Sequence, residues 1–108
     1  MVDRNLGFAL SENVYFHRRL IAERGEVRSF TLQIDIWEDG RWHTVIRCDS
    51  SHGEAHIDFI DPEGKTYDKR WLGVHRPYNH TYNQIEADFR ATWRDHVARW
   101  QRQKGDRQ

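Results

Sequence analysis

The sequence has one cysteine, two prolines and no long apolar run in its 108 residues. A single cysteine excludes an internal disulfide bond, and it favours a reducing, cytoplasmic location. No segment reaches the roughly 18 consecutive apolar residues of a membrane-spanning helix. No apolar stretch follows the first residues as it would in a secretory signal peptide. The sequence therefore predicts a cytoplasmic protein that does not associate with membranes.

The sequence also lacks an excess of either charge, since 17 basic residues balance 17 acidic residues. A protein that coats nucleic acid is usually strongly basic, so this balance argues against that class and allows only a local basic patch. Aromatic residues make up 13% of the chain, with five tryptophans. Disordered chains are poor in such residues, so we expect one folded domain spanning residues 1–108.

Alternating apolar and polar residues predict an antiparallel meander of about five strands. The clearest strand places Phe30, Leu32, Ile34 and Ile36 on one face. Its other face carries Ser29, Thr31, Gln33, Asp35 and Trp37. The alternation is interrupted near the start of the chain, so we expect residues 1–12 to be an N-terminal arm or an edge strand.

The turns between the strands predict how the strands pair. At Asp39-Gly40, a three-residue loop pairs apolar residues more often than a two-residue turn does, so we prefer the longer loop. A four-residue loop at 50–53 and a bulged turn at 61–64 extend the same inner face. The expected pairs are Ile36–Trp42, Leu32–Ile46, Cys48–Ala55, Arg47–His56 and Phe59–Tyr67.

Apolar residues recur at steps of three and four after residue 81, which predicts an amphipathic C-terminal helix. Thr81 and Gln84 fit a capping box at its start, and residues 103–108 are expected to form a frayed tail. The apolar side of the helix needs an apolar partner, and the sheet offers one. The predicted fold class is α+β, with an antiparallel meander of about five strands and one long C-terminal helix packed on one face.

Titratable residues gather on the polar face of the predicted sheet, around the turn at residues 50–53. A sheet covered on one side shows polar residues on the other in any case, so a purely structural interpretation stays open. The candidate catalytic residues are His52, His56, Arg47, Asp49 and Asp58. The candidate binding residues are Arg70, His43 and Trp37.

These residue types are those needed for metal-independent phosphodiester cleavage. His52 and His56 would act as base and acid, Arg47 would clamp the phosphate, and Asp49 or Asp58 would orient an imidazole. A metal site built from His52, His56 and an aspartate is an alternative. Its ligands would span a loop and a strand rather than one helix, so neither a metal nor another cofactor is expected.

Two further interpretations concern residues outside catalysis. Cys48 falls on the predicted inner face, where a buried and unreactive thiol is expected. A non-catalytic binding module for a protein or a nucleic acid would use the same polar face or an exposed sheet edge. In that case Trp37 and Tyr15 would stack on a base or on a partner.

Three motifs lie along the middle of the chain: Trp42-x-x-Val45-x-Arg47-x-Asp49, His52-Gly53-x-x-His56-x-Asp58 and Asp61-Pro62-x-Gly64. With the closing helix, they resemble an uncharacterised family of short prokaryotic proteins over roughly residues 27–102. Members of that family more often have Tyr in place of Cys48, and a shorter link than residues 73–80 before the helix. The motifs indicate the family and carry no information about activity.

The layout is also distantly similar to that of TumE-type toxin components of bacterial toxin–antitoxin pairs. In those proteins a strand that ends in Asp is followed by a turn with Gly and His and then by a helix, although the histidine spacing differs here. The resemblance implies a toxin that acts on RNA and is held by an antitoxin-like protein. The expected partners are therefore such a protein or RNA, with a homodimer formed through a sheet edge as an alternative.

Overall fold

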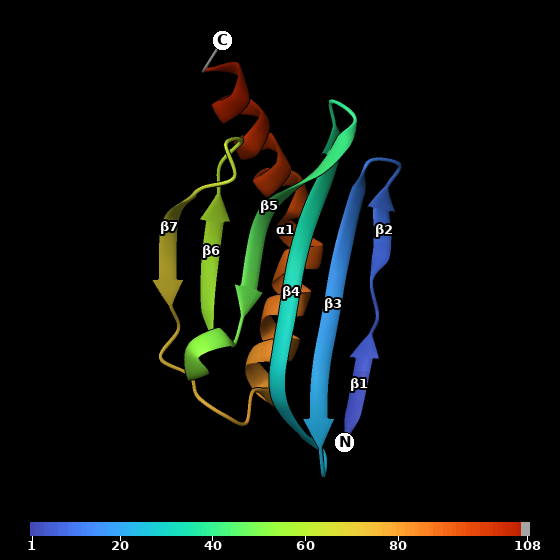
Figure 1. Cartoon of the computed structure of the whole chain (residues 1–108), viewed down its shortest axis with the longest axis vertical. Helices are drawn as coiled ribbons and strands as arrows, with labels where there is room; N and C mark the ends of the chain where they lie inside the picture. Colours follow the sequence, from blue (N-terminus) through green and yellow to red (C-terminus); the bar gives the residue numbers. More distant parts are fainter. Residues whose placement is uncertain (107–108) are drawn as a thin grey trace.

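A computed structural model describes residues 1–106 as one antiparallel sheet with a helix across it (Figure 1). The sheet has seven strands in the order β1-β3-β4-β5-β6-β7, and β2 also pairs with β3. The strands are β1 (Val2–Asn5), β2 (Phe8–Ser11), β3 (Val14–Glu23), β4 (Glu26–Glu38), β5 (Arg41–Asp49), β6 (His56–Ile60) and β7 (Thr66–Trp71). A 3-10 turn, η1 (Ser51–Gly53), joins β5 to β6, and α1 (Asn79–Gly105) closes the fold. The predicted α+β class is confirmed, although the strand count is seven rather than about five.

The two additional strands come from the N-terminal segment, which is an edge strand in two pieces. β1 pairs with the end of β3 and β2 with its beginning. Gly7 lies in the break between them, where a Cβ atom would come within 2.6 Å of the Tyr15 ring. The absence of a side chain at this position therefore lets the edge pass close to Tyr15.

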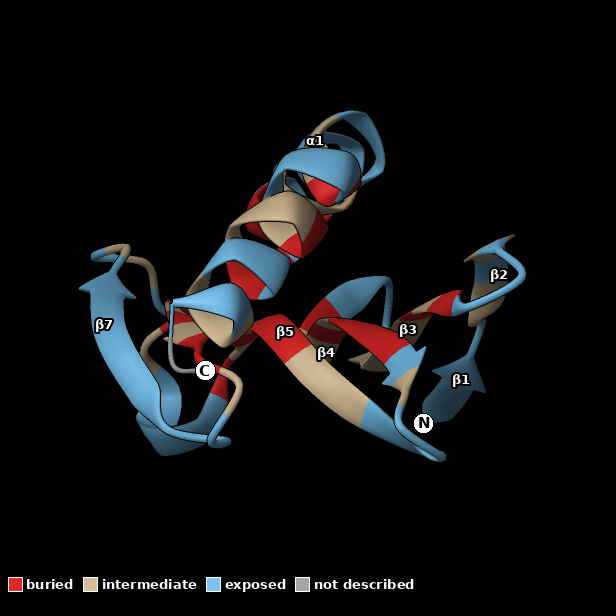
Figure 2. Ribbon diagram, turned by 90° about the horizontal axis from the view of Figure 1, so that it is seen from above, coloured by how far each residue is buried: buried red, intermediate tan, exposed pale blue. Residues whose placement is uncertain are grey.

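The core lies between α1 and one face of the sheet (Figure 2). Alternate residues of β3, β4 and β5 meet the apolar side of the helix, and Phe16 packs against Phe89 with ring centroids 6.1 Å apart. Cys48 is fully buried in this core, as predicted. No element of residues 1–106 covers the opposite face, which we call the open face. Nor does any helix in this part of the chain have the length and apolarity required to cross a bilayer.

The helix begins three residues earlier than predicted, at Asn79, with Tyr78 rather than Thr81 as its N-cap. The Asn79 side chain accepts a hydrogen bond from the Val27 amide at 2.9 Å and donates one to the Gly25 carbonyl at 2.8 Å. These bonds tie the start of the helix to the β3–β4 turn. Thr81 is buried and does not form the predicted capping box. The helix continues to Gly105, so the expected fraying is wrong for residues 103–105, and residues 107–108 lie outside the described chain.

The predicted pairing of β4 with β5 is wrong because the turn has two residues and a bulge follows it. Asp39 and Gly40 have φ values of 54° and 78°, as required by the tight turn that matches strand twist. The register then shifts at Val45. The observed pairs include Ile36–His43, Trp37–Trp42, Ile34–Ile46 and Leu32–Cys48, and not Ile36–Trp42 or Leu32–Ile46.

This turn exchanges the faces of two neighbouring side chains. His43 was expected on the open face, but its ring packs 5.2 Å from that of Trp100 on the helix side. Trp42, expected inside, lies on the open face and is 47% exposed. The bulge at Val45 restores the alternation, so Ile46 and Cys48 remain in the core as predicted. Arg99 of the helix supports the bulge by donating to the Val45 carbonyl at 2.7 Å.

The next two hairpins also differ from the predicted pairing. The β5–β6 connection is two residues longer than expected, and the observed pairs are Arg47–Asp58, Cys48–Ile57 and Asp49–His56. The expected Arg47–His56 and Cys48–Ala55 pairs are therefore wrong, but a shift of two residues leaves each side chain on its predicted face. A bulge in the β6–β7 pairing sets Phe59 opposite Asp68 instead of Tyr67. Arg70 consequently lies on the helix side, with its guanidinium 4.6 Å from the Phe59 ring.

Candidate functional site

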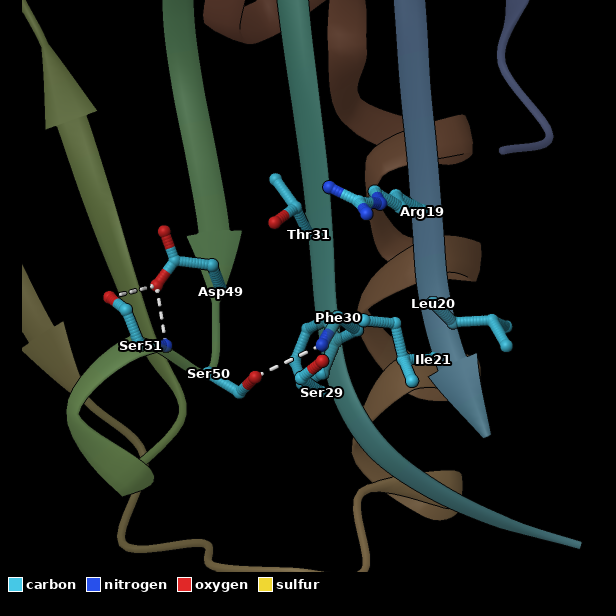
Figure 3. Close-up of a pocket in the computed structure, with 9 residues that line it drawn as sticks. All are labelled: Arg19, Leu20, Ile21, Ser29, Phe30, Thr31, Asp49, Ser50 and Ser51. Carbon is cyan, nitrogen blue, oxygen red and sulfur yellow. Dashed lines mark hydrogen bonds between the residues drawn. The ribbon is translucent and has the colours of Figure 1, made fainter. Parts of the chain in front are cut away.

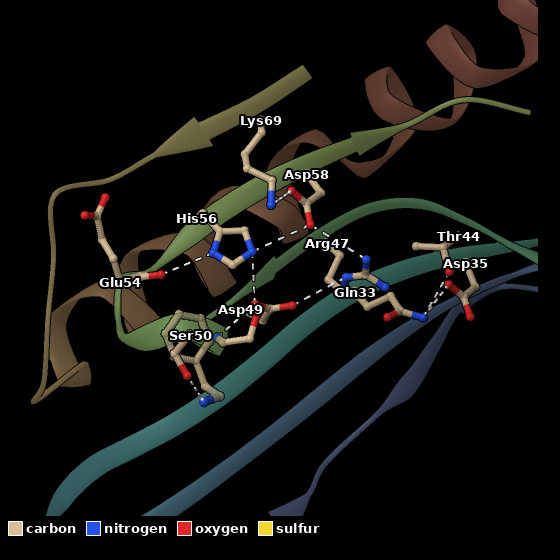
Figure 4. A network of polar contacts seen from close by, with 12 residues as sticks. Gln33, Asp35, Thr44, Arg47, Asp49, Ser50, Glu54, His56, Asp58 and Lys69 are labelled. Carbon is tan, nitrogen blue, oxygen red and sulfur yellow. Dashed lines mark hydrogen bonds and ion pairs between the residues drawn. The ribbon is translucent and has the colours of Figure 1, made fainter. Parts of the chain in front are cut away.

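A cluster of charged side chains occupies the open face where β5, β6 and β7 lie side by side (Figure 4). Strand β5 contributes Arg47 and Asp49, and β6 contributes His56 and Asp58. Strand β7 adds Lys69, which pairs with Asp58 across the strands. The first four were predicted from the sequence, whereas Lys69 was missed because the β6–β7 bulge reverses the faces of β7.

His56 is the central group of this cluster, with a side chain that is only 2% exposed. Its Nε2 atom lies 3.2 Å from Oδ1 of Asp49 and 3.6 Å from Oδ2 of Asp58. Its Nδ1 atom lies 3.2 Å from the Glu54 carbonyl oxygen. The Trp71 ring packs 5.0 Å away. Both ring nitrogens therefore face oxygen atoms of the protein, and the burial of the ring leaves neither of them exposed to solvent.

The two carboxylates of the cluster differ in how they are held. Asp49 Oδ1 accepts hydrogen bonds from the amide and the hydroxyl of Ser51, at 3.0 and 2.7 Å. Asp58 lies 3.7 Å from Nη2 of Arg47 and 3.4 Å from Nζ of Lys69. Its Oδ1 atom is buried and has no hydrogen-bond partner among residues 1–106. We call Asp49, His56 and Asp58 the histidine–carboxylate cluster.

The remaining predicted site residues lie apart from this cluster. His52 is exposed on η1, in the left-handed conformation with φ of 69°, and its ring stacks 6.5 Å from that of His56. His43 and Arg70 lie on the helix side of the sheet. Trp37 is on the open face, packed against Trp42 rather than near the cluster. The structure thus joins Arg47, Asp49, His56 and Asp58, with His52 as a neighbour.

A cavity of about 230 Å³ opens beside Asp49 on the open face (Figure 3). It lies between β3, β4 and the start of η1, and Arg19, Thr31 and Ser51 contribute polar atoms to its lining. Ser50 also lines the cavity, and its hydroxyl accepts a hydrogen bond from the Phe30 amide at 3.0 Å. The histidine–carboxylate cluster is therefore accessible from the Asp49 side, although His56 itself is covered.

A second cavity, of about 320 Å³, lies among rings farther along the open face. Its lining is Tyr15, His17, Asp35 and Trp42, which we call the aromatic pocket. The Tyr15 ring lies 4.7 Å from His17 and 6.4 Å from Trp42, and Trp37 packs edge-on against Trp42 at 5.5 Å. The sequence predicted Tyr15 and Asp35 on this face. Trp42 was missed because the incorrect β4–β5 register placed it on the inner face.

Asp35 is a buried carboxylate in the wall of this pocket, with 7% of the residue exposed. Its Oδ2 atom lies 2.9 Å from Nε2 of His17, and its Oδ1 atom accepts a hydrogen bond from the side-chain Nε2 of Gln33 at 2.9 Å. The pocket therefore combines electron-rich ring faces with a buried carboxylate that also contacts His17. Such a combination attracts a cation.

The fold and these two sites define a small α+β protein with a sheet covered by a helix on one side and bearing polar and aromatic sites on the other. The chain belongs to the family described as Domain of unknown function (DUF7718), whose family model matches residues 4–106. No curated protein and no solved structure matches the chain. The expected membership of an uncharacterised family is confirmed, whereas the likeness to toxins stays a prediction.

Proposed function

We propose that the protein is a non-catalytic binding module that takes a basic side chain of a protein partner into the aromatic pocket. The observation that carries this proposal is a buried carboxylate, Asp35, in a cavity walled by aromatic rings. We place the module in the cytoplasm, because a chain with one unpaired cysteine is typical of a reducing compartment.

The dimensions and the chemistry of the pocket support a lysine or arginine as the occupant. Its volume of about 320 Å³ is at the lower end of ligand pockets and suits one side chain. A cation within about 6 Å of a Tyr or Trp ring centre is attracted by the ring face. Asp35 would pair with the incoming charge, and the half-exposed Trp37 and Trp42 would supply apolar contact. Tryptophan is also enriched among the residues that dominate binding energy at protein interfaces.

The charges on the open face favour a protein partner over a nucleic acid. Arg19 is paired with Asp3 at 2.9 Å, and Arg47 and Lys69 lie beside Asp49 and Asp58. The cations are thus compensated within the protein, whereas nucleic-acid binding depends on cations that are free to neutralise phosphates. The formal net charge of zero agrees with this interpretation.

The geometry of His56 weighs against the cleavage hypothesis. A general acid or base must reach the proton that it transfers, either directly or through one water. His56 is buried with both nitrogens facing internal acceptors, so it does not present a nitrogen to a phosphodiester. His52 alone does not supply the acid and base pair that metal-independent cleavage requires.

The proposal is tested by titrating blocked amino acids, each acetylated at the N-terminus and methylamidated at the C-terminus, and measuring binding by calorimetry. Arginine and lysine derivatives are expected to bind, and the leucine derivative serves as the uncharged control. Trp42→Ala and Asp35→Asn are each expected to weaken binding at least about tenfold. Trp71→Ala is the matched control because Trp71 is a comparably exposed tryptophan on the same face, outside the pocket. It should bind like the wild type.

Four results would overturn the proposal. The first is equal binding of the leucine derivative, or binding that survives Trp42→Ala. A second is single-stranded RNA bound through Trp42, which would make the face a nucleic-acid interface. A third is a homodimer that Trp42→Ala dissociates, which would assign the face to a second copy. The fourth is cleavage of RNA that His56→Ala abolishes without changing the thermal midpoint, which would restore the catalytic hypothesis.

A further inference from the structure

We propose that Asp49, His56 and Asp58 form a binding site for one divalent transition-metal ion of the zinc type. Each residue offers one ligand atom, and the three atoms lie within 4.8 Å of one another. Nε2 of His56 is 3.2 Å from the Asp49 oxygen and 3.6 Å from the Asp58 oxygen. Ligands on adjacent positions around an ion with bonds of about 2.1 Å are themselves roughly 3.0–3.4 Å apart, so small side-chain adjustments bring these atoms around one ion.

The orientation of the His56 ring is that of a metal ligand. Nδ1 faces the Glu54 carbonyl at 3.2 Å, and a hydrogen bond of this kind typically orients ligating histidines and fixes their tautomer. With the hydrogen on Nδ1, the lone pair of Nε2 points toward the two carboxylates. Three electron-rich atoms then face one another, and a cation between them removes the repulsion.

Asp58 provides an independent sign that a ligand belongs at this position. Its side chain is 7% exposed, and its Oδ1 atom has no hydrogen-bond partner among residues 1–106. The nearest cationic atoms lie 3.4 and 3.7 Å away, whereas charge-assisted hydrogen bonds measure about 2.7–2.9 Å. Asp58 is therefore held only by long ion pairs, and its Oδ2 atom, which faces His56 at 3.6 Å, would gain a short bond from a metal ion.

Asp49 supplies a preorganised ligand and a route for the ion. The amide and hydroxyl of Ser51 both donate to Oδ1 of Asp49, which fixes the carboxylate that faces His56. The cavity of about 230 Å³ beside Asp49 gives access from solvent and space for water ligands (Figure 3). One imidazole and two carboxylates suit zinc-type ions, whereas magnesium and calcium prefer sites made of oxygen atoms alone.

Arg47 and Lys69 compete with the proposed ion for the same carboxylates. Arg47 lies 3.5 Å from Asp49 and 3.7 Å from Asp58, and Lys69 lies 3.4 Å from Asp58. Removing one of these cations is therefore expected to tighten metal binding. Lys69 is the better choice for substitution, because it lies on the exposed edge strand β7 and its loss should leave the fold intact.

The experiment titrates Zn²⁺ alone into chelator-treated protein and measures affinity and stoichiometry by calorimetry, with the thermal midpoint as a second readout. We expect one ion per wild-type chain and a higher midpoint with Zn²⁺. Asp58→Asn and His56→Asn should weaken binding at least about tenfold. Lys69→Met should tighten it about two- to fivefold. His17→Asn is the matched control, because His17 faces the single carboxylate of Asp35 at 2.9 Å on the same face, and it should bind Zn²⁺ like the wild type.

Absence of Zn²⁺ binding at concentrations up to about 1 mM would overturn the proposal, as would a midpoint shift that persists in folded Asp58→Asn. Weaker binding by Lys69→Met would also contradict it. NMR signals of the His56 ring that show a hydrogen on both nitrogens at saturating Zn²⁺ would also contradict it. In that case a protonated imidazolium, and not a metal ion, would bridge the two carboxylates. If His56→Asn does not fold, the wild type, Lys69→Met and His17→Asn still decide the outcome.

Discussion

Arg99 is expected to stabilise the fold by supporting the bulge that sets the register of β5. Its Nη2 atom donates to the buried carbonyl of Val45 at 2.7 Å, and its Nη1 atom donates to the Tyr67 hydroxyl at 2.6 Å. Arg99→Met keeps most of the apolar stem and removes both bonds. A hydrogen bond to a charged group contributes about 1.5–3 kcal/mol, so we expect a loss of about 2 kcal/mol. For a domain of this size that loss lowers the thermal midpoint by roughly 8–16 °C.

The assay is urea denaturation at equilibrium, monitored by tryptophan fluorescence. An unchanged slope of the unfolding free energy against urea concentration indicates that only the stability has changed. Arg102→Met is the matched control, because Arg102 lies on the same helix with an exposed side chain. Its substitution should change stability by less than about 0.5 kcal/mol. Equal stabilities for Arg99→Met and Arg102→Met would refute the role of Arg99 at the bulge.

Three further predictions concern groups whose surroundings are distinctive. Burial, with the charges of Asp49 and Asp58, raises the pKa of Cys48 to about 12. Alkylation of the Cys48 thiol at pH 8 should therefore be about a thousandfold slower in the folded protein than in the unfolded chain. Comparable alkylation rates would contradict the burial of this thiol. The pKa of His96 is lowered from 6.5, mainly by burial and next by the charge of Arg99, with a smaller contribution from Arg70. Asp88 and Asp95 oppose this shift. Below about pH 6.5 the unfolded chain therefore binds more protons than the folded protein, so the free energy of unfolding should fall as the pH drops from 7 toward 5. Urea denaturation at each pH should show a smaller fall for His96→Gln. Gly7→Ala should displace the Tyr15 ring, because the added Cβ would lie 2.6 Å from it. We expect weaker binding of the arginine derivative in the aromatic pocket, with a stability change below about 1 kcal/mol. Unchanged binding would show that Tyr15 does not shape the pocket.

The fold class could be predicted from the sequence because alternation along β3 and β4 and the helical spacing after residue 81 each define one apolar side. Those patterns determine which face of a strand is buried, and Ile46, Cys48 and His56 lie on their predicted faces. They do not determine how far one strand slides along the next. A slide of two residues leaves every face unchanged, which is why Arg47 meets Asp58 and not His56.

The errors that changed faces came from bulges and a tight turn. Val45 and Ile46 are both buried, and two consecutive buried residues break the alternation on which the prediction depends. The Asp-Gly pair is typical of two-residue turns, but the count of apolar contacts favoured the longer loop. The candidate site was therefore predicted in part: Arg47, Asp49, His56 and Asp58 were placed together, whereas Lys69 and the Trp42 side of the aromatic pocket were missed.

The central claim is that the aromatic pocket is the binding surface, and the indole N–H signals of the five tryptophans test it most directly. Titration of ¹⁵N-labelled protein with the blocked arginine derivative gives one signal per indole. We expect concentration-dependent shifts for Trp42 and Trp37, and unchanged signals for Trp71, Trp93 and Trp100. Shifts confined to Trp71, beside the histidine–carboxylate cluster, or no shift at any indole would contradict the claim.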